Sequence, residues 1–123
     1  MNIEEFREYC ISKKGVEETF PFDNNTLVMK VLDKMFALGN LDGPLSINLK
    51  CDPEKAVELR EQYAAVKPGY HMSKMHWNTV EIDGSIDIKT IQSWIDDSYN
   101  LVVSKMSKSK QELLKQERSP NIF

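Results

Sequence analysis

The sequence predicts a single α+β domain in which helices pack on an antiparallel sheet of about five strands. Alternating apolar and polar residues in the middle of the chain indicate strands, and apolar residues at helical spacing near both ends indicate helices. Short turn signals separate consecutive strands, and strands joined by tight turns pair antiparallel. The expected order is helix, three or four strands, helix, strand, helix. This order places the domain at residues 1–118 and a frayed tail at 119–123.

A helix is expected over residues 2–14. Asn2 and Glu5 have the spacing of a capping box, in which each side chain bonds the backbone N–H of the other residue at the start of a helix. Gly15 follows as a residue type that commonly ends helices. The apolar face of this helix consists of Ile3, Phe6 and Cys10.

The next segments carry the signals of strands. Thr19–Phe22 predicts a short extended segment, and its proline suits an edge of the sheet. Residues 26–32 and Met35–Leu38 predict a hairpin that turns at Asp33–Lys34. Residues 45–51 alternate between apolar and polar side chains and predict a half-buried strand.

The second half of the chain begins with another helix start. In Asp52–Pro53 the aspartate suits the cap and the proline suits the first helical position. Pro68–Gly69 predicts a loop, and residues 77–82 predict a strand. Ser85 is the expected cap of a long last helix that continues through residues 110–118. The apolar face of that helix consists of Ile88, Ile91, Ile95, Tyr99, Val102 and Met106.

The charge of the chain is negative overall but unevenly distributed. The sequence has 16 basic and 19 acidic residues and a net charge of −3, which excludes a generally basic protein that coats nucleic acid. Residues 62–80 contain no acidic residue, and residues 104–123 hold five basic against two acidic residues. An anionic ligand is repelled least by these two segments.

Familiar catalytic and cofactor motifs are absent from the sequence. It contains no phosphate-binding glycine loop, dinucleotide fingerprint, nucleophile elbow or zinc-protease motif. Cys10 and Cys51 belong to no paired-cysteine motif and are expected to be reduced and buried. No apolar run is long enough to span a membrane. The sequence therefore predicts a protein that is not an enzyme, holds no cofactor and does not enter a membrane.

The segment from Lys67 to Thr79 combines side chains that suit nucleic-acid binding. Lysines neutralise phosphates, Asn and Thr hydrogen-bond phosphates or base edges, and aromatic rings stack on bases. Tyr70 and Trp77 are expected either to stack or to serve a structural role. The candidate nucleic-acid-binding residues in this segment and near the C-terminus are Lys67, His71, Lys74, His76, Asn78, Thr79, Lys105 and Lys108. The two histidines lack a third ligand nearby, so no metal site is predicted here.

Short motifs along the chain resemble the MmcQ/YjbR family. They are Phe20-Pro21-Phe22-Asp23, Lys34-Met35-Phe36-Ala37-Leu38, Leu49-Lys50-Cys51-Asp52-Pro53-Glu54, Pro68-Gly69-Tyr70-His71-Met72 with Lys74, His76-Trp77-Asn78-Thr79-Val80, and Ser98-Tyr99 with Leu101-Val102-Val103. The resemblance covers residues 1–115. Position 73 is Ser where the family pattern has Asn, which weakens a base-reading role at that position.

This resemblance implies a CyaY-like α+β fold in a bacterial protein. It also implies a double-wing arrangement that binds DNA. Because the chain has few clustered lysines, we expect DNA binding to be weak and sensitive to salt. The acidic N-terminus lacks the pattern of an export signal, so the expected location is the cytoplasm.

Two other functions are compatible with the sequence. In the first, the protein is a module that binds a partner protein or a small anionic ligand along residues 67–79; a hollow of ligand size beside His71, Lys74 and Trp77 would favour it. In the second, the protein binds a metal ion, as frataxin-type iron proteins of the same fold do. The carboxylates that could hold such an ion are Glu4, Glu5, Glu8, Glu17, Glu18 and Asp23.

Overall fold

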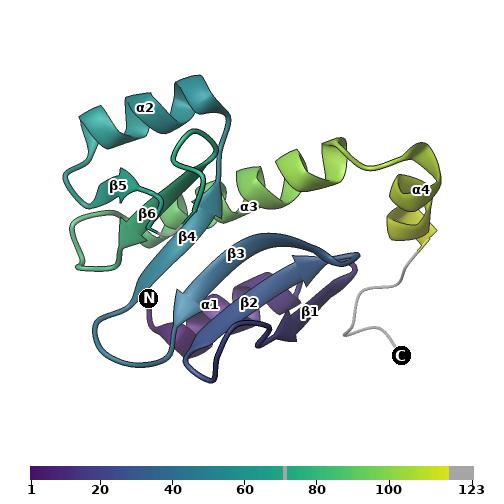
Figure 1. Cartoon of the computed structure of the whole chain (residues 1–123), viewed down its shortest axis with the longest axis horizontal. Coiled ribbons are helices and arrows are strands. Elements are labelled where there is room, and N and C mark those ends of the chain that lie inside the picture. The colour runs from purple at the N-terminus through teal and green to yellow at the C-terminus, as the bar shows by residue number, and fades with distance from the viewer. Residues whose placement is uncertain (71, 117–123) are drawn as a thin grey trace.

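An antiparallel sheet of six strands forms the centre of the fold (Figure 1). The structure, a computed structural model, describes residues 1–70 and 72–116. The strands lie in the order β1-β2-β3-β4-β6-β5, and all neighbouring pairs are antiparallel. In chain order, the elements are α1 (Ile3–Ile11), β1 (Val16–Thr19), β2 (Thr26–Val31), β3 (Lys34–Asn40), β4 (Ser46–Lys50), α2 (Pro53–Gln62), β5 (Val66–Pro68), β6 (Trp77–Glu81), α3 (Ile88–Ser104) and α4 (Lys108–Gln116).

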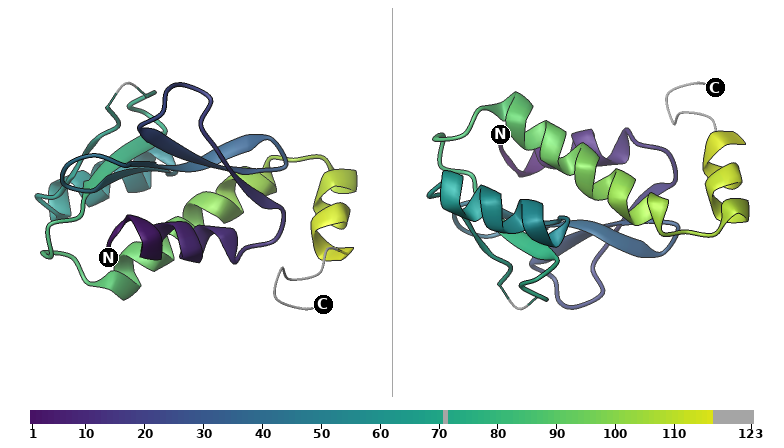
Figure 2. Two further views of the ribbon diagram at one scale, coloured as in Figure 1. Left: turned by 90° about the horizontal axis from the view of Figure 1, so that it is seen from below. Right: turned by 90° about the horizontal axis from the view of Figure 1, so that it is seen from above.

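Helices α1, α2 and α3 cover one face of the sheet, and no described helix covers the other, which we call the open face (Figure 2). Phe6 of α1, Leu59 of α2 and Ile95 of α3 share the main core with Phe36 and Ile47 of the sheet. A second, smaller cluster lies on the open face. It consists of Val28, Leu38 and Trp77, with Met35 and Met72 packed against it.

A β-bulge decides which side chains of β3 face the helices. The register of β3 against β2 shifts by one residue, which makes Phe36 an extra residue in its strand. As a result, Phe36 and Ala37 both lie in the main core. Their neighbours Met35 and Leu38 belong to the cluster on the open face. The bulge therefore supplies apolar side chains to both faces from four consecutive residues.

The predicted α+β class and antiparallel sheet are confirmed, but two predicted elements in the first half have different bounds. Strand β1 ends at Thr19, so the extended segment predicted over Thr19–Phe22 is wrong beyond its first residue. The hairpin turns one residue earlier than predicted, at Leu32 and Asp33, which have φ angles of 45° and 71°. Two consecutive residues with positive φ form the tight turn whose twist matches that of paired strands.

The second half differs from the prediction at three places. Strand β5 (Val66–Pro68) was not predicted and raises the sheet from about five strands to six. Asp87, not Ser85, is the cap residue of α3, and the Ser85 backbone N–H instead bonds Asp83. Helix α4 (Lys108–Gln116) is separate from α3. Residues 117 and 118 of the predicted last helix and the tail at 119–123 lie outside the described residues, so the domain boundary at 118 stays a prediction.

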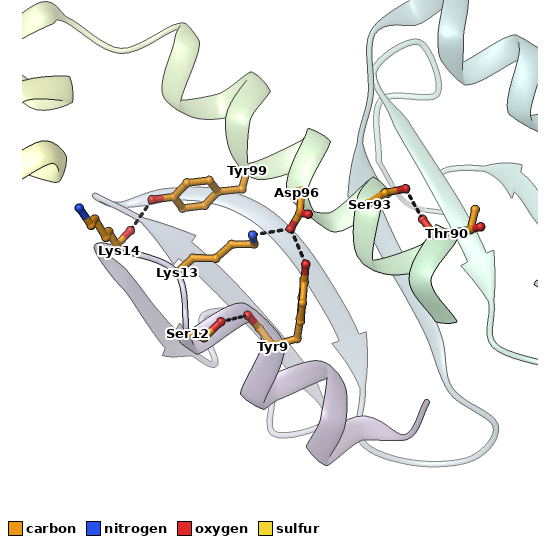
Figure 3. Close-up of polar contacts among 8 residues, drawn as sticks. All are labelled: Tyr9, Ser12, Lys13, Lys14, Thr90, Ser93, Asp96 and Tyr99. Carbon is orange, nitrogen blue, oxygen red and sulfur yellow. Dashed lines mark hydrogen bonds and ion pairs between the residues drawn. The ribbon is translucent and has the colours of Figure 1, made fainter. Parts of the chain in front are cut away.

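A polar cluster fastens the end of α1 to the middle of α3 (Figure 3). The Asp96 carboxylate accepts hydrogen bonds from the Tyr9 hydroxyl at 2.7 Å and from the Lys13 ammonium at 2.5 Å. The same ammonium lies 5.0 Å and 5.3 Å from the ring centres of Tyr9 and Tyr99. The Tyr99 hydroxyl donates to the carbonyl of Lys14 at 2.6 Å.

None of the described helices is long and apolar enough to cross a membrane.

Candidate functional site

A groove with a volume of about 660 Å³ lies where β3, β4 and β6 approach the α3–α4 junction. Its lining includes four lysines from four different segments: Lys34, Lys50, Lys105 and Lys110. Among the described residues, no acidic side chain lines it and none forms an ion pair with any of the four lysines. We call this feature the lysine groove. It concentrates positive charge in a chain whose net charge is −3.

The groove forms because β3 and β4 separate at one end. Their pairing ends at Ala37 and Leu49. Beyond that point, the backbone N–H of Lys50 donates to the Ser98 hydroxyl at 2.8 Å instead of to β3. Lys50 lies opposite Trp77 of β6, a residue that is 7% exposed and contributes to the lining of the groove. The pairing of β4 with β6 thus holds a lysine beside an aromatic residue, and the separation of β3 from β4 leaves room for the groove next to them.

The far wall of the groove comes from the junction between α3 and α4. Lys105 caps the C-terminal end of α3, and Lys110 lies in the first turn of α4. The backbone N–H of Gln111 donates to the Ser107 carbonyl at 3.0 Å, and its side-chain amide donates to the Met106 carbonyl at 3.0 Å. Leu114 anchors α4 in the main core. These contacts fix the position of the helix that carries Lys110.

Only part of the predicted binding set lies at this groove. Lys105 and Trp77 line it, whereas Lys108 begins α4 beside it. Lys67 lies on β5 and forms a 2.7 Å ion pair with Glu81, which neutralises its charge. Lys34, Lys50 and Lys110 were not predicted, because no local motif shows that their three segments meet.

The exposed part of the predicted segment lies on the connection between β5 and β6. Lys74 and His76 are exposed there, and neither lines the lysine groove. Their backbone carbonyls accept hydrogen bonds, at 3.2 Å from the Arg60 side chain and at 2.7 Å from the backbone N–H of Cys51. His71 lies outside the described residues. These contacts hold the connection against α2 and the end of β4.

Asn78 is the predicted contact residue that the structure places differently. It is only 2% exposed and lies beneath α2, where its side-chain amide donates to the Ala56 carbonyl at 3.2 Å. Its carbonyl oxygen has no partner among the described residues. The predicted surface contact is therefore corrected to an interior position. Trp77 packs against Val28 and Leu38 and also lines the lysine groove, so the choice between its two predicted roles stays a prediction.

A second depression, with a volume of about 490 Å³, lies on the open face; we call it the open-face hollow. Its floor is formed by β3, β4 and β6, and its walls by the loop at 20–25 and by the described residues of the connection between β5 and β6, at 69–70 and 72–76. Both loops rise from the same side of the sheet (Figure 2). Among the predicted residues, Thr79 lies on the floor and Tyr70 in the wall. The described lining includes no basic side chain.

The acidic residues considered for metal binding do not converge. Glu5 bonds the Asn2 backbone in the predicted capping box, which the structure confirms. Glu18 pairs with Arg7 through two contacts of 2.5 and 2.8 Å, and these contacts lower the pKa of the Glu18 carboxyl. Asp23 accepts the backbone N–H groups of its own loop. No three His, Cys, Asp or Glu side chains gather as metal ligands in residues 1–70 and 72–116.

Comparison with known proteins decides the family. The family model described as YjbR matches residues 11–101. The Escherichia coli K12 "Uncharacterized protein YjbR" is 36% identical over 117 residues, which cover 94% of this chain and 99% of that protein. The chain belongs to the YjbR family. The resemblance predicted from the short motifs is thereby confirmed.

Other YjbR-family relatives agree in sequence and fold. "Uncharacterized protein YbdF" of Escherichia coli O157:H7 is 40% identical over 98 residues, covering 79% of this chain and 80% of that protein. The crystal structure of Deinococcus radiodurans protein DR2400, family-model domain DUF419, has a TM-score of 0.87 and 37% identity, covering 98% of this chain and 92% of that one. A Pseudomonas syringae crystal structure has a TM-score of 0.72 and 31% identity, covering 82% and 98%. These names state no reaction or ligand.

Proposed function

We propose that this YjbR-family protein binds nucleic acid through its phosphates, with the lysine groove as the contact surface. The observation that carries this proposal is the convergence of four lysines in a groove whose lining, in residues 1–70 and 72–116, contains no carboxylate. Unpaired lysines attract phosphates and release counterions when they bind. The names of the relatives include no enzyme, and we propose a binding role without catalysis.

Trp77 adds a different kind of contact to the same groove. Trp77 is mostly buried, but it is among the residues that line the groove, and it is the register partner of Lys50. An aromatic surface next to a cation suits the sugar and base of a nucleotide whose phosphate the cation holds. The groove therefore offers both electrostatic and apolar contacts within one depression.

The number of lysines in the groove sets the expected strength of DNA binding and its dependence on salt. Four phosphate contacts on a DNA duplex predict that the logarithm of the binding constant falls with the logarithm of the salt concentration with a slope of about −3.6. The expected dissociation constant is that of non-specific binding, about 10⁻⁴ to 10⁻⁶ M at physiological salt. The net charge of −3 opposes tighter binding.

Fluorescence anisotropy of labelled single- and double-stranded DNA tests the proposal at about 50 and 200 mM salt. Lys50→Ala and Lys105→Ala are each expected to weaken binding to all sequences and to reduce the salt slope by about one. Lys67→Ala is the matched control, because its ammonium is paired with Glu81 outside the groove. That variant is expected to bind DNA as the unchanged protein does.

Two results would overturn this assignment. Absence of binding at low salt up to ~100 μM protein, the weak end of non-specific affinity, would exclude unaided DNA binding. Weakening by Lys74→Ala but not by Lys50→Ala would move the contact surface to the loop between β5 and β6. If inorganic phosphate shifts the groove resonances in NMR while DNA does not bind, the groove serves a small anion instead.

A further inference from the structure

The open-face hollow contains a hydrogen-bond chain that orients one side-chain amide. The backbone N–H of Tyr70 donates to the Thr79 hydroxyl at 3.0 Å. The Thr79 hydroxyl in turn donates its single proton to the side-chain carbonyl oxygen of Asn48 on the neighbouring strand. The carbonyl end of this amide is therefore engaged. Its NH₂ group makes no hydrogen bond to a described residue and lies at the floor of the hollow.

The Asn48 amide differs from that of Asn40, an asparagine whose hydrogen bonds are all structural. The Asn40 NH₂ group donates to the carbonyls of Asp42 and Pro44 at 2.6 and 2.9 Å, and its carbonyl oxygen accepts from the Ser46 N–H at 2.7 Å. Asn40 thus uses both ends to hold the loop between β3 and β4. Asn48 uses one end and leaves two N–H donors toward the hollow.

The walls above this amide are aromatic and apolar. Phe22 and Tyr70 come from the two different loops and are 62% and 72% exposed. Leu38 and Met72 add apolar surface to the lining. Large aromatic side chains on opposite loops offer flat faces on which a planar ring can stack.

The charge of the hollow selects against anions. Its described lining includes no basic side chain, and its one charged residue is Asp23. That carboxylate accepts the N–H groups of Asn25 and Thr26 at 2.8 and 2.7 Å, which lower its pKa and keep it ionised at neutral pH. A phosphate or carboxylate ligand would be repelled, whereas a neutral ligand would not. A volume of about 490 Å³ is within the usual range for small-molecule sites.

We propose that the open-face hollow binds a neutral planar heterocycle of the nucleobase class, which accepts a hydrogen bond from the Asn48 amide and stacks on Tyr70 or Phe22. The ligand is either a free nucleoside or an unpaired base of a strand. A test with free nucleosides does not depend on the lysine groove, because a nucleoside carries no phosphate. The two proposals can therefore fail independently.

NMR titration of the full chain with adenosine, cytidine and uridine tests the site. We expect saturable shifts of the Asn48 side-chain NH₂ and the Tyr70 backbone N–H, with a dissociation constant on the order of 0.1–1 mM for at least one nucleoside. Asn48→Asp keeps an acceptor for Thr79 but removes the donor, and is expected to weaken binding at least tenfold. Asn100→Ala is the matched control, because it removes a side-chain amide at an exposed position of α3, outside the hollow.

Tyr70→Ala gives a second variant that leaves the sheet residues unchanged, and it is also expected to weaken binding. The proposal is overturned if no nucleoside shifts these resonances up to about 10 mM, or if the shifts map only to the lysine groove. Single-stranded DNA distinguishes the two sources of the ligand. If Asn48→Asp weakens the binding of single-stranded DNA, the ligand is an unpaired base of a strand. If nucleosides bind but Asn48→Asp does not change the binding of DNA, the ligand is a free nucleoside. Both results support the site.

Discussion

The hydroxyl of Ser98 on α3 donates a 2.5 Å hydrogen bond to the carbonyl oxygen of Phe36 on β3. The same hydroxyl accepts a 2.8 Å hydrogen bond from the backbone N–H of Lys50 on β4. Ser98 is fully buried at the place where these two strands separate. One side chain of a helix thus satisfies one backbone group on each strand, and one of these groups belongs to Lys50, which lines the lysine groove.

Replacing Ser98 by Ala is expected to lower the free energy of unfolding by about 1–3 kcal/mol, because it leaves a buried N–H and a buried carbonyl without a partner. Urea unfolding measures the change. Ser93→Ala is the control: its hydroxyl donates to the Thr90 carbonyl on the exposed side of the same helix, so we expect a change within about 0.5 kcal/mol. Equal stability of the two variants would contradict the bridging role.

The phenol of Tyr9 is expected to ionise near pH 12. Burial and the hydrogen bond to Asp96 raise its pKa from 10.0 to about 12. Since the unfolded chain ionises this group at lower pH, its contribution to stability is complete below pH 10 and is lost as pH rises toward 12. Tyrosinate absorbance across this range measures the step, and Tyr9→Phe identifies it by removing it.

Asp96→Asn separates the causes of that shift. The variant removes the negative charge beside Tyr9 but leaves the burial, so the pKa of the phenol is expected to fall toward, without reaching, its ordinary value. The range of pH over which Tyr9 stabilises the fold narrows accordingly. An unchanged ionisation step in Asp96→Asn would show that Asp96 does not act on Tyr9.

The two thiols are expected to differ in reactivity. Cys10 is fully buried, and burial raises its pKa to about 12. Cys51 is partly exposed, and burial followed by the charges of Asp52 and Asp97 raises its pKa as well. A disulfide reagent should therefore react slowly with Cys51 in the folded protein and with Cys10 only in urea. Cys51→Ser should abolish the reaction of the folded protein with the reagent. If both thiols of the folded protein react at the same rate, the expected difference in reactivity is contradicted.

The local elements could be predicted because their signals lie within a few residues. Asn2 and Glu5 form the capping box that their spacing predicts. Pro53 starts α2 as expected, although the Asp52 side chain makes no capping hydrogen bond. Residues 45–51 alternate because one side of β4 faces the helices, so the strand was visible from its pattern. The solved YjbR relatives confirm the α+β class.

The lysine groove could not be predicted because it depends on pairing between distant segments. Lys50 lies beside Trp77 only because β4 pairs with β6. These two strands are neighbours in the sheet, although α2 and β5 separate them in the sequence. Of the four groove lysines, only Lys105 was predicted, from the charge of the C-terminal segment. The absence of acids near Lys67 was misleading, since Glu81 reaches it across the strand pair. Strand β5 was missed because three residues are too few to show alternation.

Gly69 allows the loop of the open-face hollow to lie against β6. A Cβ atom at this position would lie 2.8 Å from the Cβ and 2.9 Å from the carbonyl oxygen of Trp77, which also accepts the Gly69 N–H at 2.9 Å. Neither atom can move without disturbing the strand. Gly69→Ala is therefore expected to lower the free energy of unfolding by about 1–3 kcal/mol and to displace Tyr70 from Thr79.

Urea unfolding and the NMR shift of the Tyr70 N–H measure these two effects of Gly69→Ala. Gly84→Ala is the control, because a Cβ there meets no atom within 4 Å and the cost arises only from a φ of +85°. Both variants should lose stability, but only Gly69→Ala should shift the Tyr70 and Asn48 resonances. If Gly84→Ala also shifts these resonances, the hollow responds to a general loss of stability. If Gly69→Ala leaves the Tyr70 and Asn48 resonances unshifted, the close approach of Gly69 to Trp77 does not position the loop.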